Sequence, residues 1–128
     1  AGAASHDLPP ISEHYLVMRF DASLVFINSA FFEQAVMKAI SQFPQAKAVL
    51  VIGDGINRVD ATGEETLRAL AADLKLAGVT LALSSLKKPV KEALIRAGLD
   101  AVIGRETLFP NKDLALRTLA ERYDLARA

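Results

Sequence analysis

The chain has 128 residues, with 15 Lys and Arg against 15 Asp and Glu, and no cysteine. This length suits one domain with its own core, and the balanced charge lacks the broad positive field with which nucleic-acid-binding proteins recruit phosphates. The lack of cysteine excludes disulfides, thiolate nucleophiles and sulfur-based metal sites, and it fits a reducing, cytoplasmic setting.

The N-terminal segment, residues 1–11, has small residues and a Pro-Pro pair without apolar periodicity. We assign it to a linker or cloning remnant, and residues 12–126 to a single domain. No apolar run approaches the roughly 18 residues of a membrane-spanning helix. Two short strands are expected next, at residues 15–20 and 24–27, joined in a hairpin by a tight turn.

An amphipathic helix follows the expected hairpin, with its N-cap at Asn28 and its end near Pro44. Its apolar residues recur at spacings of three and four and form one stripe, made of Phe32, Ala35, Val36, Ala39, Ile40 and Phe43. Residues 48–52 then form a continuous apolar run, typical of a central strand covered on both faces.

The second half of the chain repeats the alternation of helix and strand. A second helix is predicted from about Gly63 to Gly78, followed by a strand at residues 79–83. A third helix begins at Pro89 and ends at Gly98.

A short last strand is expected at residues 101–103, and a final helix runs from beyond Pro110 to about Arg122. Strands that alternate with single helices pair in parallel through right-handed crossovers, whereas the opening hairpin contributes an antiparallel piece. The expected fold is therefore an α/β domain with a mixed sheet of four to five strands and about four surrounding helices.

Motifs of enzyme chemistry are incomplete in this sequence. Residues 53–55 read Gly-Asp-Gly after a buried strand, but the third glycine of a dinucleotide fingerprint would fall on Arg58. The two histidines, His6 and His14, lie in the first segment, without a second ligand-type residue at helical spacing and remote from the serines of the domain body. We therefore predict a non-catalytic protein without a metal or a cofactor.

The segment 57–65 is the most informative stretch of the chain. Thr62 and Glu65 fit a capping box in which Thr62 is the N-cap, worth about 1 kcal/mol to the helix. The same hydroxyl is also a candidate phosphoacceptor, because a helix N-terminus favours an anion. A phosphate there would sit among Asp60, Glu64 and Glu65, and the modified surface would repel a partner.

A second unusual feature is Lys87-Lys88 before Pro89, since cations at a helix N-terminus oppose its dipole. An anion or nucleotide held by the two lysines with Ser84 and Ser85 would restore the balance. The alternative is two solvated lysines on a loop.

The carboxyl edge of the sheet collects these features if the strands at 48–52 and 79–83 are parallel neighbours. Side chains from both loops would then share one surface. The residues that we assign to an interaction loop there are Asp54, Asn57, Arg58, Asp60, Thr62 and Gly63.

Several segments in this order resemble the STAS domain. They are residues 19–21, 24–28, 60–63, 74–78, 88–90, 97–99 and the pair Phe109-Pro110. The closer resemblance is to the version at the cytoplasmic C-terminus of SulP anion transporters, whose Phe-x-Asn start of a helix stands here at residues 26–28. The likeness covers about residues 12–122.

The resemblance implies a mixed sheet surrounded by helices and a non-catalytic, regulatory role. The domain would serve a transporter of the sulfate, bicarbonate or dicarboxylate class on the cytoplasmic side of the inner (plasma) membrane. Its partners would be the transmembrane domain of that transporter and a cytoplasmic regulatory protein, with no nucleic acid.

The resemblance also implies two alternatives. In stand-alone anti-sigma factor antagonists the hydroxyl residue of D-x-[ST]-G is phosphorylated by a partner kinase, and Thr62 occupies that position here. Nucleotide binding has also been proposed for the family, which would use Lys87, Lys88 and the helix starts.

Overall fold

The computed structural model describes residues 5–7 and 13–124. A five-stranded sheet in the order β1-β2-β3-β4-β5 runs through it. β1 is antiparallel to β2, and the remaining neighbours are parallel. The strands are β1 (Ser5–Asp7), β2 (Tyr15–Phe20), β3 (Ala48–Ile52), β4 (Thr80–Ser84) and β5 (Leu108–Phe109). The predicted α/β fold with a mixed sheet is confirmed.

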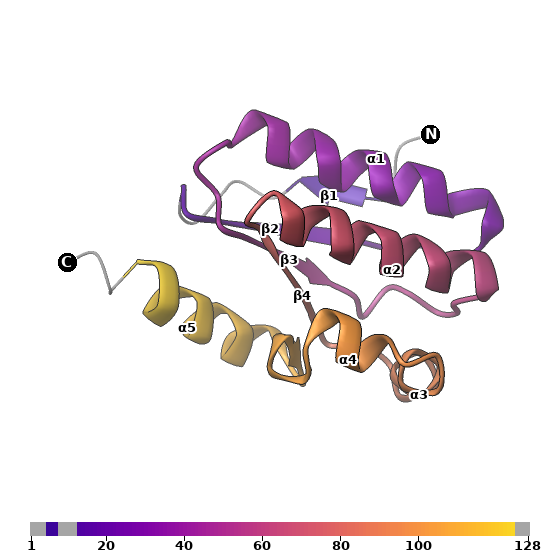
Figure 1. Cartoon of the computed structure of the whole chain (residues 1–128). Helices are drawn as coiled ribbons and strands as arrows, with labels where there is room; N and C mark the ends of the chain where they lie inside the picture. The colour runs from indigo at the N-terminus through magenta and orange to yellow at the C-terminus, as the bar shows by residue number, and fades with distance from the viewer. Residues whose placement is uncertain (1–4, 8–12, 125–128) are drawn as a thin grey trace.

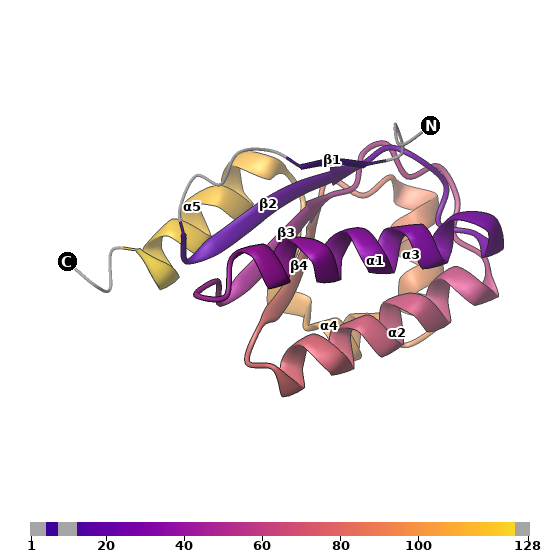
Figure 2. The same cartoon turned by 90° about the horizontal axis from the view of Figure 1, so that it is seen from above.

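Helices cover both faces of this sheet (Figure 1). Figure 2 shows α1 and α2 side by side on one face and α5 on the other. The helices are α1 (Phe26–Gln42), α2 (Ala61–Leu76), α3 (Lys88–Arg96), α4 (Leu99–Ile103) and α5 (Lys112–Tyr123), with a 3-10 turn at Arg105–Thr107. Within the described ranges, none of them combines the length and apolar character that crossing a bilayer demands.

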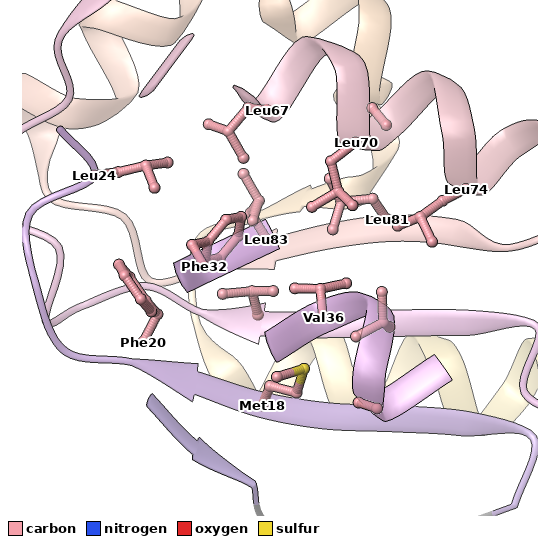
Figure 3. Close-up of a cluster of buried hydrophobic side chains, with 14 of the residues drawn as sticks. Met18, Phe20, Leu24, Phe32, Val36, Leu67, Leu70, Leu74, Leu81 and Leu83 are labelled. Carbon is pink, nitrogen blue, oxygen red and sulfur yellow. The ribbon is translucent and has the colours of Figure 1, made fainter. Parts of the chain in front are cut away.

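The central strand β3 explains the continuous apolar run in the sequence. Because successive side chains of a strand point to opposite faces, Val49 and Val51 join the cluster under α1 and α2, while Leu50 and Ile52 join the cluster under α5. Figure 3 shows the first cluster, in which side chains of α1 and α2 pack over β2 and β4. The labelled members are Met18, Phe20, Leu24, Phe32, Val36, Leu67, Leu70, Leu74, Leu81 and Leu83.

The expected hairpin is wrong. Residues 24–27 form no second strand, because α1 begins at Phe26, and Leu24 makes only an isolated parallel bridge to Val59. The antiparallel neighbour of β2 is β1, formed by residues 5–7 of the segment that we assigned to a linker. The remainder of residues 1–11 lies outside the described residues.

The start of α1 also differs from the prediction. Val25 rather than Asn28 is the N-cap, without a side-chain hydrogen bond. Asn28 lies in the first turn, where its side-chain amide donates to the carbonyl of Ser23 at 2.9 Å. The side chain of Asn28 thus stabilises the loop that leads into the helix instead of capping it.

Residues 101–103 belong to α4 and not to a last strand. Three apolar residues are too short a run to show whether their period is that of a strand or a helix. The preceding Gly98 adopts a left-handed conformation (φ 75°) and Leu99 is buried, which turns the chain directly from α3 into α4. The last strand is β5, and five helices therefore surround the sheet in the described residues.

Candidate interaction face

Two loops meet where the parallel strands end. The loop after β2 runs beside the loop after β3, and the two are joined by backbone hydrogen bonds. The N–H of Leu24 donates to the carbonyl of Arg58 at 2.8 Å, and the N–H of Asp60 donates to the carbonyl of Leu24 at 3.3 Å. These bonds bring the first turns of α1 and α2 to the same end of the molecule (Figure 2).

The carboxylate of Asp60 connects the two helix starts. Its Oδ1 accepts from the N–H of Gly63 in α2 at 2.8 Å, and its Oδ2 accepts from the N–H of Phe26 in α1 at 3.0 Å. Both donors are among the N–H groups that a helix leaves without an internal partner. One side chain therefore caps two helices.

The charge of Asp60 is favoured by this geometry. The hydrogen bond from Gly63 is the main reason that the pKa of Asp60 lies below its ordinary value. Desolvation opposes this effect and comes second in size, and the bond from Phe26 and the positive charge of Arg58 add smaller effects that lower the pKa. Asp60 is therefore ionised at neutral pH and interacts favourably with both helix dipoles.

Thr62 is not the N-cap that we expected. Asp60 is the N-cap of α2, so Thr62 lies in the first turn and is exposed, and no capping box forms with Glu65. Both Asp and Thr are common N-cap residues, and Asp is the more strongly preferred of the two. Glu65 instead pairs with Arg68 at 3.5 Å. The hydroxyl of Thr62 remains accessible at a helix start.

Close backbone contact explains the glycine of the Asp-x-Thr-Gly segment. A Cβ atom on Gly63 would lie 2.0 Å from the carbonyl oxygen of Leu24. Gly55 is similarly constrained, because its Cβ would lie 2.8 Å from the Cα of Asp21. The two loops therefore pack backbone against backbone, and a side chain at either glycine would separate them.

The other residues of the predicted interaction loop make contacts within the chain. Asp54 is exposed and accepts two hydrogen bonds from one nitrogen of Arg19, at 2.8 and 3.0 Å. The ammonium group of Lys87 donates to the side-chain carbonyl of Asn57, which links the loop after β3 to α3. Asn57 and Arg58 are exposed. The structure thus brings residues of the loop after β3 and of the loop after β4 together at one edge of the sheet.

The four residues of the predicted anion contact differ in exposure. Ser84 is 0% exposed, and its hydroxyl accepts a 3.3 Å hydrogen bond from the half-buried Ser85. Lys87 and Lys88 are exposed, unlike Ser84. Ser84 is a residue of the strand β4, so the accessible groups of the predicted anion contact are the two lysines, and the contact itself stays a prediction.

Two apolar residues of this face escaped the sequence analysis. Phe26 is 74% exposed and Ile27 is 83% exposed in the first turn of α1. The signal was present, because the apolar stripe of the helix extends back through Ser29 to Val25 and leaves residues 26 and 27 beside it. Contiguous exposed apolar groups with a polar rim mark protein interaction sites, and Phe26 and Ile27 are adjacent in the chain.

We call the surface formed by Phe26, Ile27, Arg58, Asp60 and Thr62 the Asp60 face. Its carboxylate is held by backbone N–H groups, and its remaining groups are apolar side chains, a guanidinium and a hydroxyl. In the part of the chain that the structure describes, no group of three His, Asp or Glu side chains could hold a metal ion. The arrangement suits contact with another surface.

Comparisons with known proteins agree on one family. A family model described as the STAS domain matches residues 8–115. A probable sulfate transporter of Mycobacterium tuberculosis is 28% identical over 108 residues, which are 84% of this chain and 19% of that protein. The chain therefore spans about one fifth of the length of this curated relative.

Solved structures show the same fold. The STAS domain of a SulP transporter from Vibrio cholerae matches with a TM-score of 0.71 at 21% identity, covering 90% of this chain and 85% of that one. A Thermotoga maritima protein named as an anti-sigma factor antagonist matches with a TM-score of 0.70 at 13% identity, covering 86% and 90%.

Replacing Gly63 by Ala tests the close contact of the two loops. The added methyl group overlaps the carbonyl of Leu24, so the variant should lose about 2 kcal/mol of unfolding free energy or more. Thr62→Ala is the matched control, and it should change the unfolding free energy by less than about 0.5 kcal/mol because Thr62 is exposed and is not the cap. Urea unfolding measures both, and a larger loss in Thr62→Ala would restore Thr62 as the N-cap.

The acid stability of the fold should depend on Asp60. Its pKa is lower in the folded than in the unfolded chain, so its carboxylate stabilises the fold fully above the unfolded pKa of about 3.9. That contribution is lost as the pH falls through the lower folded pKa. In Asp60→Asn the melting temperature should therefore be lower at neutral pH and fall less steeply below about pH 4 than in the wild type.

Circular dichroism melts between neutral pH and pH 2 measure this difference. Asp73→Asn, in an exposed part of α2, removes the same charge away from both helix starts. An Asp60→Asn profile that ran parallel to the wild-type profile at all pH values would contradict the double cap.

Proposed function

The chain belongs to the STAS domain family, and we propose from this premise that it is the non-catalytic regulatory domain of a SulP-type anion transporter. The family resemblance expected from the sequence is confirmed by the family model and by the sulfate transporters among the relatives. The proposed partner is the transmembrane domain of the parent transporter, on the cytoplasmic side of the inner (plasma) membrane.

The exposed pair Phe26 and Ile27 is the observation that carries this proposal. An apolar side chain of this size gains roughly 1.5–3 kcal/mol when it is fully buried, so docking of the pair would contribute several kcal/mol to binding. The backbone at the start of the pair is anchored, because the N–H of Phe26 donates to the carboxylate of Asp60. A preorganised apolar anchor needs little ordering on binding.

A non-catalytic role is supported by the ionised carboxylate of Asp60 and by the hydroxyl of Thr62 on the Asp60 face. The carboxylate of Asp60 is bound to two N–H groups and ionised, which makes it a poor general acid at neutral pH. Thr62 has an accessible hydroxyl, but activating it as a nucleophile would require an adjacent base. The Asp60 face therefore suits binding of a partner protein through its apolar side chains and its charged groups.

A second candidate function is favoured by the exposure of Thr62. A phosphate on this hydroxyl would lie at the N-terminus of α2, whose dipole favours an anion. It would also lie next to the Asp60 carboxylate and turn a largely apolar face into a strongly negative one. Such a change would switch partner binding in a stand-alone antagonist of an anti-sigma factor.

The proposal is tested in the full-length product of the parent gene. Replacing Phe26 and Ile27 together by Ser should lower anion uptake into proteoliposomes by about tenfold, because docking loses its apolar anchor. Leu76→Ser is the matched control, since Leu76 is 89% exposed at the opposite end of α2. The control should transport like the wild type.

Uptake by the double variant equal to that of the control would contradict docking through the Asp60 face. A parent gene product without membrane spans, phosphorylated on Thr62 by a kinase of the same organism, would support the second candidate instead. Mass spectrometry after incubation with the kinase identifies the modified residue, and Thr62→Ala is its control.

A further inference from the structure

An open cleft lies beside the Asp60 face, between the loop after β3 and helix α3. Its volume is about 170 Å³, and its lining includes Asn57, Arg58, Val59, Val90 and Arg96. Val90 is buried and Val59 is half-buried, and both arginines are exposed. The cleft therefore combines apolar wall groups with two cationic side chains.

Within residues 5–7 and 13–124, no carboxylate forms a salt bridge with the two guanidinium groups of the cleft. Among the described residues, neither Arg58 nor Arg96 makes a salt bridge or a side-chain hydrogen bond, although Arg58 is near enough to Asp60 to help lower its pKa. Three other arginines do pair with acidic side chains, namely Arg19, Arg68 and Arg105. The positive charges of the cleft remain available to an external anion.

Lysines strengthen the positive field at this edge. Lys87 bonds to Asn57, which places its ammonium group against a residue that lines the cleft. Lys88 and Lys91 follow on α3 and are exposed, with Glu92 as the acidic residue of that helix. This local excess stands out because the whole chain has a formal net charge of zero.

We propose that this cleft, the Arg58–Arg96 cleft, is a binding site for a small organic carboxylate. A guanidinium presents parallel N–H donors that match the two oxygens of a carboxylate, and the valine side chains provide contact for an aliphatic stem. Pockets for drug-sized ligands measure roughly 300–1,000 Å³, so 170 Å³ suits a compact anion better than a nucleotide.

Binding in the cleft does not depend on the proposed function. Arg58 also belongs to the Asp60 face, so an anion bound to Arg58 would partly neutralise the positive charge beside Asp60. The coupling of such binding to partner docking rests on the proposed function. The binding itself is measured on the chain alone.

Titration of the ¹⁵N-labelled chain with sodium glutarate tests the site by NMR. We expect saturable shifts of the backbone amides at residues 57–59 and 88–96, which sodium chloride at the same ionic strength does not produce. Arg58→Ala and Arg96→Ala should each weaken binding about tenfold, since each removes a charge-assisted hydrogen-bond donor. Arg117→Ala, at an exposed position of α5, is the matched control and should bind like the wild type.

The proposal is overturned if sodium chloride produces the same shifts, or if the Arg117 variant weakens binding as much as the cleft variants do. Sodium sulfate serves as a second probe without an aliphatic stem. Sulfate binding as tight as that of glutarate would refute the assignment of the site to organic carboxylates. The amide spectra also show whether each variant is folded. Loss of binding counts as evidence only for variants that are folded.

Discussion

The carboxylate of Asp60 fixes the starts of both long helices that cover one face of the sheet. It caps α2 through Gly63 and holds α1 through Phe26, and its charge is favoured by these same N–H groups. The contact is possible only because Gly63 lets the first turn of α2 approach the backbone of Leu24. The caps of both helices, the ionised state of Asp60 and the close packing at Gly63 therefore depend on one another.

The surface at this point follows from that constraint. When α1 begins at Phe26, its apolar stripe enters the core while Phe26 and Ile27 remain in solvent. When α2 begins after Asp60, Thr62 is displayed beside them. An apolar anchor, an ionised cap and an accessible hydroxyl therefore occupy one face, which is the basis for the proposed regulatory role in a member of the STAS family.

The sequence predicted the sheet, its central strand and most helices, because β3 is a continuous apolar run and the helices have clear periodicity and glycine or proline ends. It also selected Asp60, Thr62 and Gly63. It assigned the cap to the wrong residue, since Asp and Thr both occur at N-caps and the deciding contact, with Leu24, joins segments far apart in the chain. Short segments such as β1 carry too few residues to show a period.

Photo-crosslinking from residue 27 tests the central claim most directly. A benzoylphenylalanine in place of Ile27, in the full-length product of the parent gene, should form a crosslink to the transmembrane domain upon irradiation. The same group in place of Leu76, which is as exposed but lies at the far end of α2, should not. Crosslinks from residue 76 with none from residue 27 would show that another surface carries the interaction.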